Sequence, residues 1–419
     1  MKKALSILAA LLLTLLAVPF TGLAEDVVTI DYWQYFYESK VNLMTDLIAE
    51  FEAANPGIKV VQTTFPYDSY QEKLAAAIAA GEGPDIVNLF YGWVPTYVKS
   101  GVLQELPAAS FSAETIETEF APLVQINKFD GKYYTIPIAV RTLGLLYNKD
   151  ILAANGFDAP PTTLEELVEM AVACTKRDAN GTLTVEGLTF QPSGQLHTYF
   201  RPVLLKLFGQ EPLSEDYKTV LWNKSEGGYQ AFEWLCELNT KHRVGEQDFM
   251  TDDVTAFRQG AAAMTIDGSF RLGTLAGDKD LNYGVAVLPS YNGVSSSFGS
   301  FWTNGILKGT ESKELEASEK FLAFLTSADV MKRWTKSIGE IGARTSIAQD
   351  EELLADEKLA PFIKMLPVAS SYFYVDEAAD RQVVLDAVNM VLMEGVDPRE
   401  ALDYAVGQAQ AILDAYWND

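Results

Sequence analysis

Hydrophobic and polar positions follow two different periods over the first ninety residues. Three apolar, β-branched or aromatic runs are typical of buried strands: residues 27–33, 58–65 and 85–90. Between them, apolar residues recur at helical spacing, and the two predicted helices end at Asn55-Pro56-Gly57 and at Gly81. Strands that alternate with helices over short connections predict βαβ units, a parallel sheet and right-handed crossovers. The sequence therefore predicts an α/β fold.

The rest of the chain continues this mixed pattern. Residues 132–152 contain two strand-like runs separated at 141–144, and strand character returns at 261–266 and at 282–289, before a polar stretch at 291–300. The predicted helices of this part cover residues 164–176, 198–208, 228–242, 383–393 and 399–417. At 419 residues the chain is long for one hydrophobic core, which favours two domains of ordinary size.

The N-terminus has the three parts of a secretory signal peptide. Two lysines form a basic start, residues 4–18 are apolar, and Gly22-Leu23-Ala24 supplies small residues for cleavage. We therefore predict that residues 1–24 are removed; an uncleaved anchor helix is the alternative. The residue directly after the cleavage point is not a cysteine, so lipid attachment through an N-terminal cysteine is excluded. The protein is expected free in solution outside the cytoplasm, in the periplasm if the organism has two membranes.

The net charge of the chain limits the classes of molecule that it could bind. The formal net charge is −25, which argues against binding to nucleic acid or anionic lipid, because their phosphates need a cationic surface.

The two cysteines, Cys174 and Cys236, both fall in predicted amphipathic helices. In an oxidising compartment they could form a disulfide, and two buried free thiols fit the pattern equally well.

Aromatic side chains follow each of the first three predicted strands. The stretch IDYWQYFYES, residues 30–39, carries five rings within six positions. In an open parallel sheet, ligands bind beyond the carboxyl ends of the strands, so rings that gather there predict a binding surface. The predicted contact residues of this region are Trp33, Tyr35, Tyr67, Asp68, Tyr91 and Trp93. Tyr32 is expected to point into the packing of the sheet.

The motifs of common enzyme classes are missing from the sequence. The two histidines lie in different segments without cysteine partners, and there is no Gly-x-Ser-x-Gly elbow, Walker loop or Gly-x-Gly-x-x-Gly. This pattern predicts a binding protein that needs no cofactor or metal. Aromatic faces beside polar side chains suit a sugar, whose C–H face stacks on rings while its hydroxyls bind polar groups. A peptide, a polyamine, or a secreted carbohydrate-active enzyme with a pair among the 57 carboxylates remain alternatives.

Five segments resemble the extracellular solute-binding proteins of bacterial ABC importers, in the carbohydrate class typified by maltose-binding protein. The segments are GEGPDIV (81–87), YVKSGVLQEL (97–106), IPIAVRTLGLLYNKDIL (136–152), AFRQGAAAMTIDGSF (256–270) and NYGVAVLP (282–289). They occur in the family's order and spacing. The resemblance implies a monomer that captures a sugar and delivers it to the importer's membrane permease subunits. A chemosensory role would use the same fold.

The resemblance also implies a periplasmic-binding-protein fold of two α/β lobes with parallel-rich sheets. A hinge would be crossed three times, near residues 137–140, 299–302 and 341–344, and would close the lobes over the ligand. The N-terminal lobe would comprise residues 25–137 plus 303–341. The C-terminal lobe would comprise residues 138–302 plus 342–419.

Further contact residues follow from the resemblance and from strand ends. Arg141 stands where the maltose-binding pattern has a ligand-contacting glutamate, and Phe270 stands where it has a stacking tryptophan. Arg141 would bind an acidic sugar, because arginine pairs with carboxylates in bidentate fashion, or would form a surface salt bridge. Arg344 would donate to a sugar hydroxyl or fix the third crossing. The remaining predicted contacts are His197, Tyr199, Asp267, Trp302 and Arg381.

Overall fold

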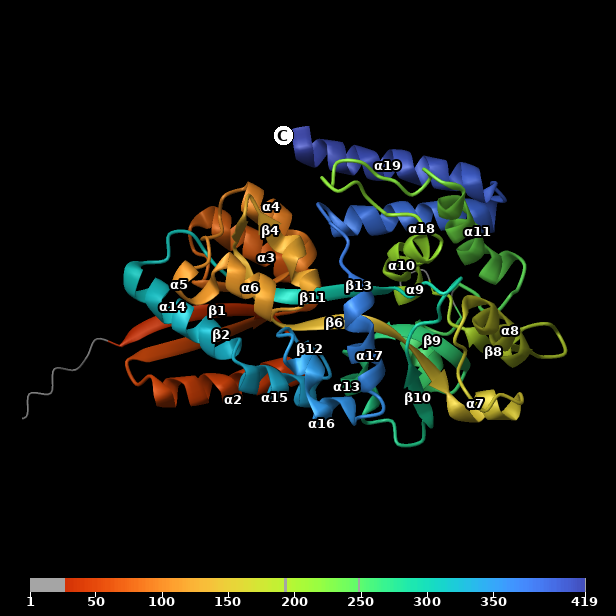
Figure 1. The fold of residues 1–419 in the computed structure, drawn as a ribbon, viewed down its shortest axis with the longest axis horizontal. Helices are drawn as coiled ribbons and strands as arrows, with labels where there is room; N and C mark the ends of the chain where they lie inside the picture. Colours follow the sequence, from red (N-terminus) through yellow and green to blue (C-terminus); the bar gives the residue numbers. More distant parts are fainter. Residues whose placement is uncertain (1–26, 192–193, 248, 419) are drawn as a thin grey trace, which may run out of the picture.

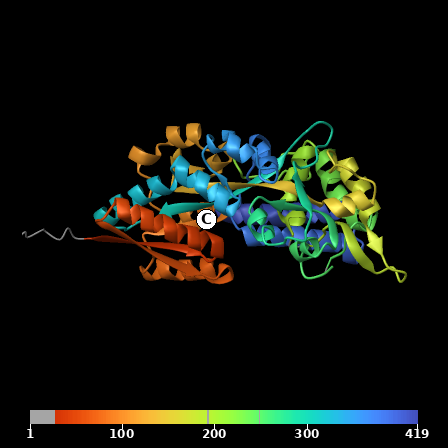
Figure 2. The ribbon, with the colours of Figure 1, turned by 90° about the horizontal axis from the view of Figure 1, so that it is seen from below.

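The computed structural model describes residues 27–191, 194–247 and 249–418. The predicted signal peptide lies outside the described residues. Two groups of helices and strands lie side by side along the longest axis of the molecule, and one mixed sheet runs through both (Figures 1 and 2). This is the two-lobed α/β architecture that the sequence predicts.

Within the described residues, the central sheet has eleven strands. Its main path runs in the order β2 (Ile58–Phe65), β1 (Val28–Tyr35), β3 (Ile86–Phe90), β11 (Ser297–Ile306), β6 (Thr135–Asn148), β9 (Ala262–Gly268), β8 (Leu183–Leu188) and β7 (Lys176–Arg177). Three further strands pair off this path: β10 (Tyr283–Ala286), β12 (Ile341–Gly342) and β13 (Ala369–Ser370). A separate hairpin consists of β4 (Lys128–Phe129) and β5 (Lys132–Tyr133). Strand β1 pairs in parallel with both β2 and β3, which confirms the predicted βαβ units.

Helices cover both faces of the N-terminal part of the sheet, with α2 and α15 on one side and α3 and α4 on the other (Figure 1). The helices of this lobe are α2 (Glu38–Ala54), α3 (Tyr67–Ala80), α4 (Val94–Lys99), α5 (Ala108–Phe111), α6 (Ala113–Glu119), α14 (Ser312–Leu325) and α15 (Ala328–Ile338). Helix α3 ends at Gly81, which adopts the left-handed conformation with φ 73° that glycine reaches without strain. Tyr32 is buried and meets Phe321 of α14 edge to face at 6.0 Å, as predicted for the sheet-facing ring.

The remaining helices surround the other half of the sheet. They are α7 (Lys149–Ala154), α8 (Leu164–Cys174), α9 (Gln195–Thr198), α10 (Phe200–Leu207), α11 (Glu226–Thr240), α12 (Asp253–Arg258), α13 (Arg271–Leu275), α16 (Glu351–Leu354), α17 (Ala360–Met365), α18 (Glu377–Glu394) and α19 (Pro398–Asn418). Short 3₁₀ helices occur at η1 (Tyr91–Trp93), η2 (Pro122–Asn127), η3 (Ile347–Gln349) and η4 (Leu366–Val368). Helices α18 and α19 pack together along one side of this lobe (Figure 1). The end of α19 returns to the first lobe, where the Tyr416 hydroxyl donates to the Pro95 carbonyl at 3.2 Å.

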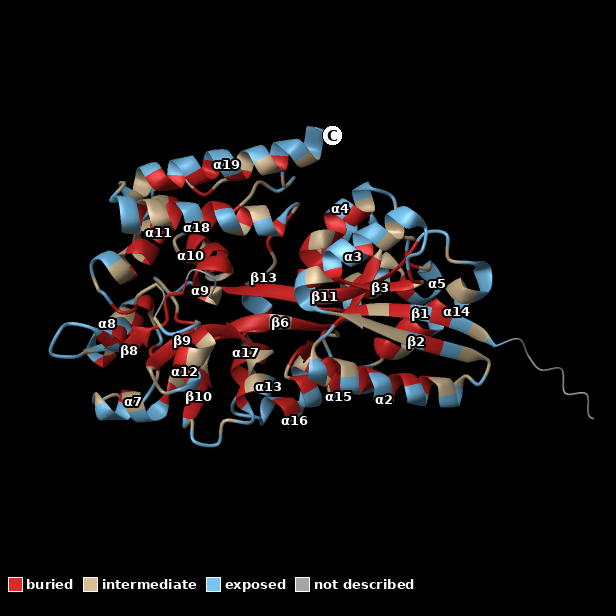
Figure 3. Cartoon of the chain, turned by 180° about the vertical axis from the view of Figure 1, so that it is seen from behind, coloured by how far each residue is buried: buried red, intermediate tan, exposed pale blue. Residues whose placement is uncertain are grey.

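Strand β6 corrects the prediction of two runs separated at residues 141–144. It is continuous because those residues remain paired: Arg141 and Thr142 pair with β11, and Leu143 and Gly144 pair with β9. The strand changes partner here without breaking. Residues 297–300, the end of the polar stretch noted in the sequence, likewise belong to β11, in which every residue is buried (Figure 3).

Three chain segments lie side by side where the hinge crossings were predicted. Ala139 of β6 pairs with Trp302 of β11 on one side and with Gly342 of β12 on the other. Val140 pairs in the same way with Phe301 and Ile341. The three segments thus meet at one level of the sheet, between the two groups of helices.

Both cysteines are free thiols in the structure. Cys174 of α8 and Cys236 of α11 are buried, and neither forms a disulfide. Burial raises the pKa of the Cys236 thiol to about 12 and raises that of Cys174 as well. Of the two interpretations left open by the sequence, the structure supports the free thiols.

We expect neither thiol to react with iodoacetamide in the native protein, because the thiolate is the reactive form and both groups are buried and protonated. After unfolding without a reductant, both should be alkylated, which intact-mass measurement would detect as two added groups. Incorporation of no group after unfolding would instead indicate a disulfide.

Candidate ligand-binding site

Four of the predicted contact residues meet in one aromatic cluster, and a fifth, Trp33, connects to it through two further rings. The cluster consists of Trp33, Tyr35, Tyr67, Trp93 and Trp302. Trp302 lies at its centre, with ring centroids 4.1 Å from Tyr35, 5.3 Å from Trp93 and 6.1 Å from Tyr67. Trp33 joins from β1 by packing on Phe65 at 4.7 Å, and Phe65 in turn stacks on Tyr70 beside Trp93. The ends of β1, β2 and β3 thus bring their rings to one edge of the sheet.

The exposed fraction of the rings increases across the aromatic cluster, from a buried base to an exposed rim. Tyr35 and Trp302 are only 5% and 8% exposed, whereas Tyr67 is 55% exposed. Trp33 and Trp93 are intermediate between these limits. Rings that served only the core would be covered throughout, so the rim offers faces on which a ligand ring can stack. Asp68, next to Tyr67 in the first turn of α3, is exposed as well.

A buried charged triad of Lys40, Arg141 and Glu340 supports the base of the cluster. Oε1 of Glu340 accepts from Lys40 Nζ at 2.8 Å and from Arg141 Nε at 2.5 Å, and Oε2 accepts from Trp334 Nε1 at 3.0 Å. The Tyr35 hydroxyl accepts from Lys40 at 2.8 Å and from Arg141 Nη2 at 3.3 Å. Burial alone would raise the pKa of Glu340, but the charges of Arg141 and Lys40 outweigh it and lower that pKa to about 2.

Residues of the C-terminal lobe face this edge from the other side. Tyr199 stacks on Phe298 at 4.7 Å, its hydroxyl lies 3.5 Å from Glu377, and Arg381 pairs with the same carboxylate at 3.5 Å. Partial burial raises the pKa of the Tyr67 hydroxyl, with a further contribution from the charge of Glu377. Arg381 and Arg141 also act on the Tyr67 hydroxyl, in the opposite direction. Arg141 links the two sides directly, because it donates to the Tyr35 hydroxyl at 3.3 Å and lies over the Phe270 ring at 4.7 Å.

Phe270 and Asp267 lie at the end of β9, beside the triad. The Arg141 guanidinium covers the Phe270 ring at 4.7 Å, and Arg271 approaches the same ring at 5.3 Å. Asp267 is buried and accepts from Arg271 Nε at 2.6 Å. The Phe270 ring is therefore near the cluster, while the Asp267 carboxylate is already neutralised by its own neighbour.

Three of the predicted contact residues lie away from the aromatic cluster. Tyr91 turns to the opposite side of η1, where it stacks on Phe301 at 4.9 Å and donates to the Tyr372 carbonyl. His197, a predicted contact, is fully buried in α9. Arg344 pairs with Glu119 and donates to the Thr326 carbonyl at 2.6 Å. These contacts favour packing roles for Tyr91 and His197, and fixing of the third crossing for Arg344.

Sequence reasoning missed three residues that complete the arrangement: Lys40, Glu340 and Glu377. Lys40 had a visible signal, because it occupies the buried face of α2 at helical spacing with Leu43, Met44 and Leu47. A lysine at such a position needs a buried partner. Glu340 directly precedes the third predicted crossing, but nothing local in the sequence identifies it as that partner.

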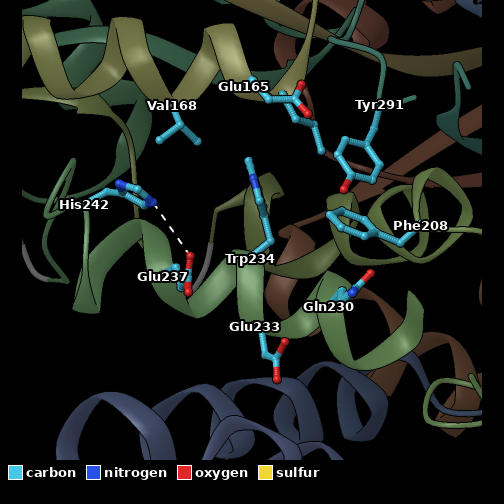
Figure 4. A pocket seen from close by; sticks show the side chains of 10 residues that line it. Glu165, Val168, Phe208, Gln230, Glu233, Trp234, Glu237, His242 and Tyr291 are labelled. Atoms are coloured by element: carbon cyan, nitrogen blue, oxygen red, sulfur yellow. Dashed lines mark ion pairs between the residues drawn. The ribbon is translucent and has the colours of Figure 1, made fainter. Parts of the chain in front are cut away.

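A pocket of about 380 Å³ lies elsewhere, between α8 and α11 (Figure 4). Phe208 stacks on Tyr291 at 4.2 Å along one wall, and Glu237 lies 3.8 Å from His242 on another. None of the predicted contact residues lines this pocket. Across the described part of the chain, no group of three or more His, Cys, Asp or Glu residues could hold a metal ion.

Comparison with known proteins identifies the family. The family model of bacterial extracellular solute-binding proteins matches residues 46–361. The chain belongs to this family. The resemblance seen in the sequence motifs is thereby confirmed. Within the described residues of this solute-binding protein, no helix is both long and apolar enough to cross a membrane.

Two relatives and one solved structure show how far the similarity extends. The maltotriose-binding protein of Pyrococcus abyssi is 24% identical, over 79% of this chain and 70% of its own. The galactooligosaccharide-binding protein of Bacillus subtilis is 23% identical, over 90% and 88% of the two chains. The crystal structure of the cyclic α-maltosyl-1,6-maltose binding protein of Arthrobacter globiformis has a TM-score of 0.79 at 21% identity, covering 93% of this chain and 99% of that one. The last comparison confirms the predicted periplasmic-binding-protein fold of this solute-binding protein.

Proposed function

We propose that this solute-binding protein captures a carbohydrate between its two lobes and delivers it to the membrane permease subunits of an ABC importer. The observation that carries the proposal is the aromatic cluster, which gathers rings from three strand ends and from β11 opposite Tyr199 and Arg381. The relatives that bind maltotriose and galactooligosaccharides support a sugar as the ligand.

The exposed rim of the aromatic cluster suits the C–H face of a pyranose. Tyr67 and the half-buried Trp33 and Trp93 would stack on sugar rings, while Asp68 and Arg381 would bind hydroxyl groups. Tyr199 and Phe270 would complete the contacts from the C-terminal lobe. Tyr91, His197 and Arg344 are left out of the proposed site because their side chains are engaged elsewhere.

Capture would use hinge closure. The three segments that meet at Ala139 and Val140 would act as the hinge between residues 25–137 plus 303–341 and residues 138–302 plus 342–419. The closed, liganded form would be the one the permease accepts. Removal of residues 1–24 would release the protein as a monomer into the periplasm. The ligand would leave unchanged, without catalysis.

Thermal unfolding against a panel of mono-, di- and oligosaccharides tests this function. A ligand at about 100 times its dissociation constant adds roughly 2.7 kcal/mol of stability, which is an easily measured shift. We expect a shift with one group of sugars and recovery of that sugar unchanged by mass spectrometry. Hydrolysed sugar would indicate an enzyme, and shifts with peptides or polyamines alone would overturn the carbohydrate assignment.

A further inference from the structure

The charges of the buried triad do not balance. Lys40 and Arg141 share the single carboxylate of Glu340, and both are bound to the same oxygen atom. The other oxygen is taken by the neutral indole of Trp334. The side chains of Lys40 and Glu340 are each only 5% exposed, so solvent does little to screen the excess positive charge. One positive charge is left over at the base of the aromatic cluster.

No neighbouring carboxylate of the described residues compensates for this charge at close range. Glu377 of α18 is paired with Arg381, and Asp267 of β9 is paired with Arg271, so both pairs are neutral. Asp68 and Asp376 lie at the exposed beginnings of α3 and α18, where water screens them. The excess is therefore a local property, in a protein whose formal net charge is −25.

Arg141 directs this charge toward the region between the lobes. Its side chain is 15% exposed, and its guanidinium lies between the Tyr35 hydroxyl at 3.3 Å and the Phe270 ring at 4.7 Å. Its Nε and Nη2 bind Glu340 and Tyr35, which leaves the Nη1 donors without a partner among the described residues. The Tyr35 hydroxyl accepts from both cations and keeps its own proton to donate. An open guanidinium edge beside a hydroxyl donor is a binding site for a carboxylate.

We propose that the ligand is an acidic sugar, a uronate or an oligosaccharide containing one, whose carboxylate binds Arg141 and the Tyr35 hydroxyl. This inference rests on the proposed function and narrows it to a class of substrate. The aromatic cluster would stack on the sugar ring while the unbalanced charge of the triad selects the carboxylate. A neutral sugar would leave that charge unmatched in a desolvated site.

The proton on Lys40 makes the selection dependent on pH. Lys40 faces Glu340, Arg141, Tyr35, Tyr37 and Trp334. Burial lowers its pKa to about 8, against the opposing effect of Glu340. Above that pH Lys40 becomes neutral and Glu340 alone balances Arg141. The preference for an acidic sugar should therefore be strong at pH 7 and weaker at pH 9.5.

Calorimetric titration with matched sugar pairs tests the proposal at pH 7: glucuronate with glucose, galacturonate with galactose, and trigalacturonate with galactotriose. We expect at least one acidic member to bind ten times or more tighter than its neutral partner. Arg141→Gln should reduce that ratio to about twofold. Arg258→Gln makes the same change in net charge at an exposed pair with Asp278, and should leave the ratio unchanged.

The possible outcomes distinguish a failure of the acidic-sugar assignment from a failure of the proposed carbohydrate-binding function. Neutral members that bind as well as or better than their acidic partners overturn the acidic-sugar assignment and leave a carbohydrate-binding protein. A preference that survives Arg141→Gln also overturns it, because the carboxylate would then be held elsewhere. If no member of the panel binds, while the protein unfolds cooperatively, the result counts against both the inference and the carbohydrate assignment.

Discussion

Replacing Glu340 by alanine lowers the free energy of unfolding by about 3–5 kcal/mol, because it leaves two buried cations without their carboxylate. Lys40 and Arg141 are the two cations that bind Oε1 of Glu340, at 2.8 and 2.5 Å. The Trp334 indole would lose its acceptor as well. Denaturant unfolding monitored by circular dichroism measures the change.

Glu352 provides a matched control for this prediction. It also pairs with two lysines, Lys332 and Lys336, but its side chain is 60% exposed. Glu352→Ala should therefore change stability by less than about 1 kcal/mol. The double variant Lys40→Met with Glu340→Ala should recover part of the loss by removing one unpaired charge. Equal small effects of Glu340→Ala and Glu352→Ala would contradict the importance of the buried triad.

The pKa of Glu340 adds a dependence on pH to the same prediction. The carboxyl has a pKa of about 2 in the folded protein, below its ordinary value of 4.5, so its ionised form stabilises the fold. That contribution is complete above about pH 4.5 and is lost as the pH falls toward 2. Glu340→Gln should therefore lose less stability between pH 5 and pH 3 than the unchanged protein does. A parallel fall in both would show that other groups govern acid unfolding.

The sequence was most informative where the signal is local. The first three strands and the helices between them were predicted because each follows one pattern over its whole length, and because Asn55-Pro56-Gly57 and Gly81 end the two helices. The clustering of Trp33, Tyr67 and Trp93 followed from the same pattern, since carboxyl ends of parallel strands share an edge. Periodicity did not distinguish Tyr91 from Trp93, two positions apart in η1, which point to different neighbours.

The pattern of hydrophobic and polar residues could not show which residues far apart in the sequence pair in the fold. Residues 141–144 interrupt the apolar run with an arginine and a glycine, yet they remain in one strand because β11 and β9 bind them in turn. The charged triad joins positions 40, 141 and 340, which come together only in the folded chain. Of the three residues, only Lys40 gave a local signal in the sequence, because a lysine on the apolar face of a helix needs a buried partner.

Replacing Trp302 by alanine should weaken sugar binding at least 100-fold, equivalent to about 2.7 kcal/mol. Its ring is the common neighbour of Tyr35, Tyr67 and Trp93, so its loss would release the rim rings from the positions in which they would stack on sugar. Because Trp302 is only 8% exposed, the variant should also lose about 3–5 kcal/mol of stability. Titration calorimetry with the sugar that stabilises the unchanged protein measures the affinity, at a temperature where the variant is folded.

Two further variants separate binding from stability in this test. Tyr67→Ala removes a ring that is 55% exposed, so it should cost little stability and still weaken binding at least tenfold. Trp234→Ala removes a tryptophan from the pocket between α8 and α11, away from the aromatic cluster, and should leave the affinity unchanged (Figure 4). If folded Trp302→Ala and Tyr67→Ala proteins bound sugar as tightly as the unchanged protein, the cluster would be a core feature and the site would lie elsewhere. Loss of affinity in these two variants alone would place the sugar against the rim, because the three substitutions remove rings of similar kind and differ mainly in position.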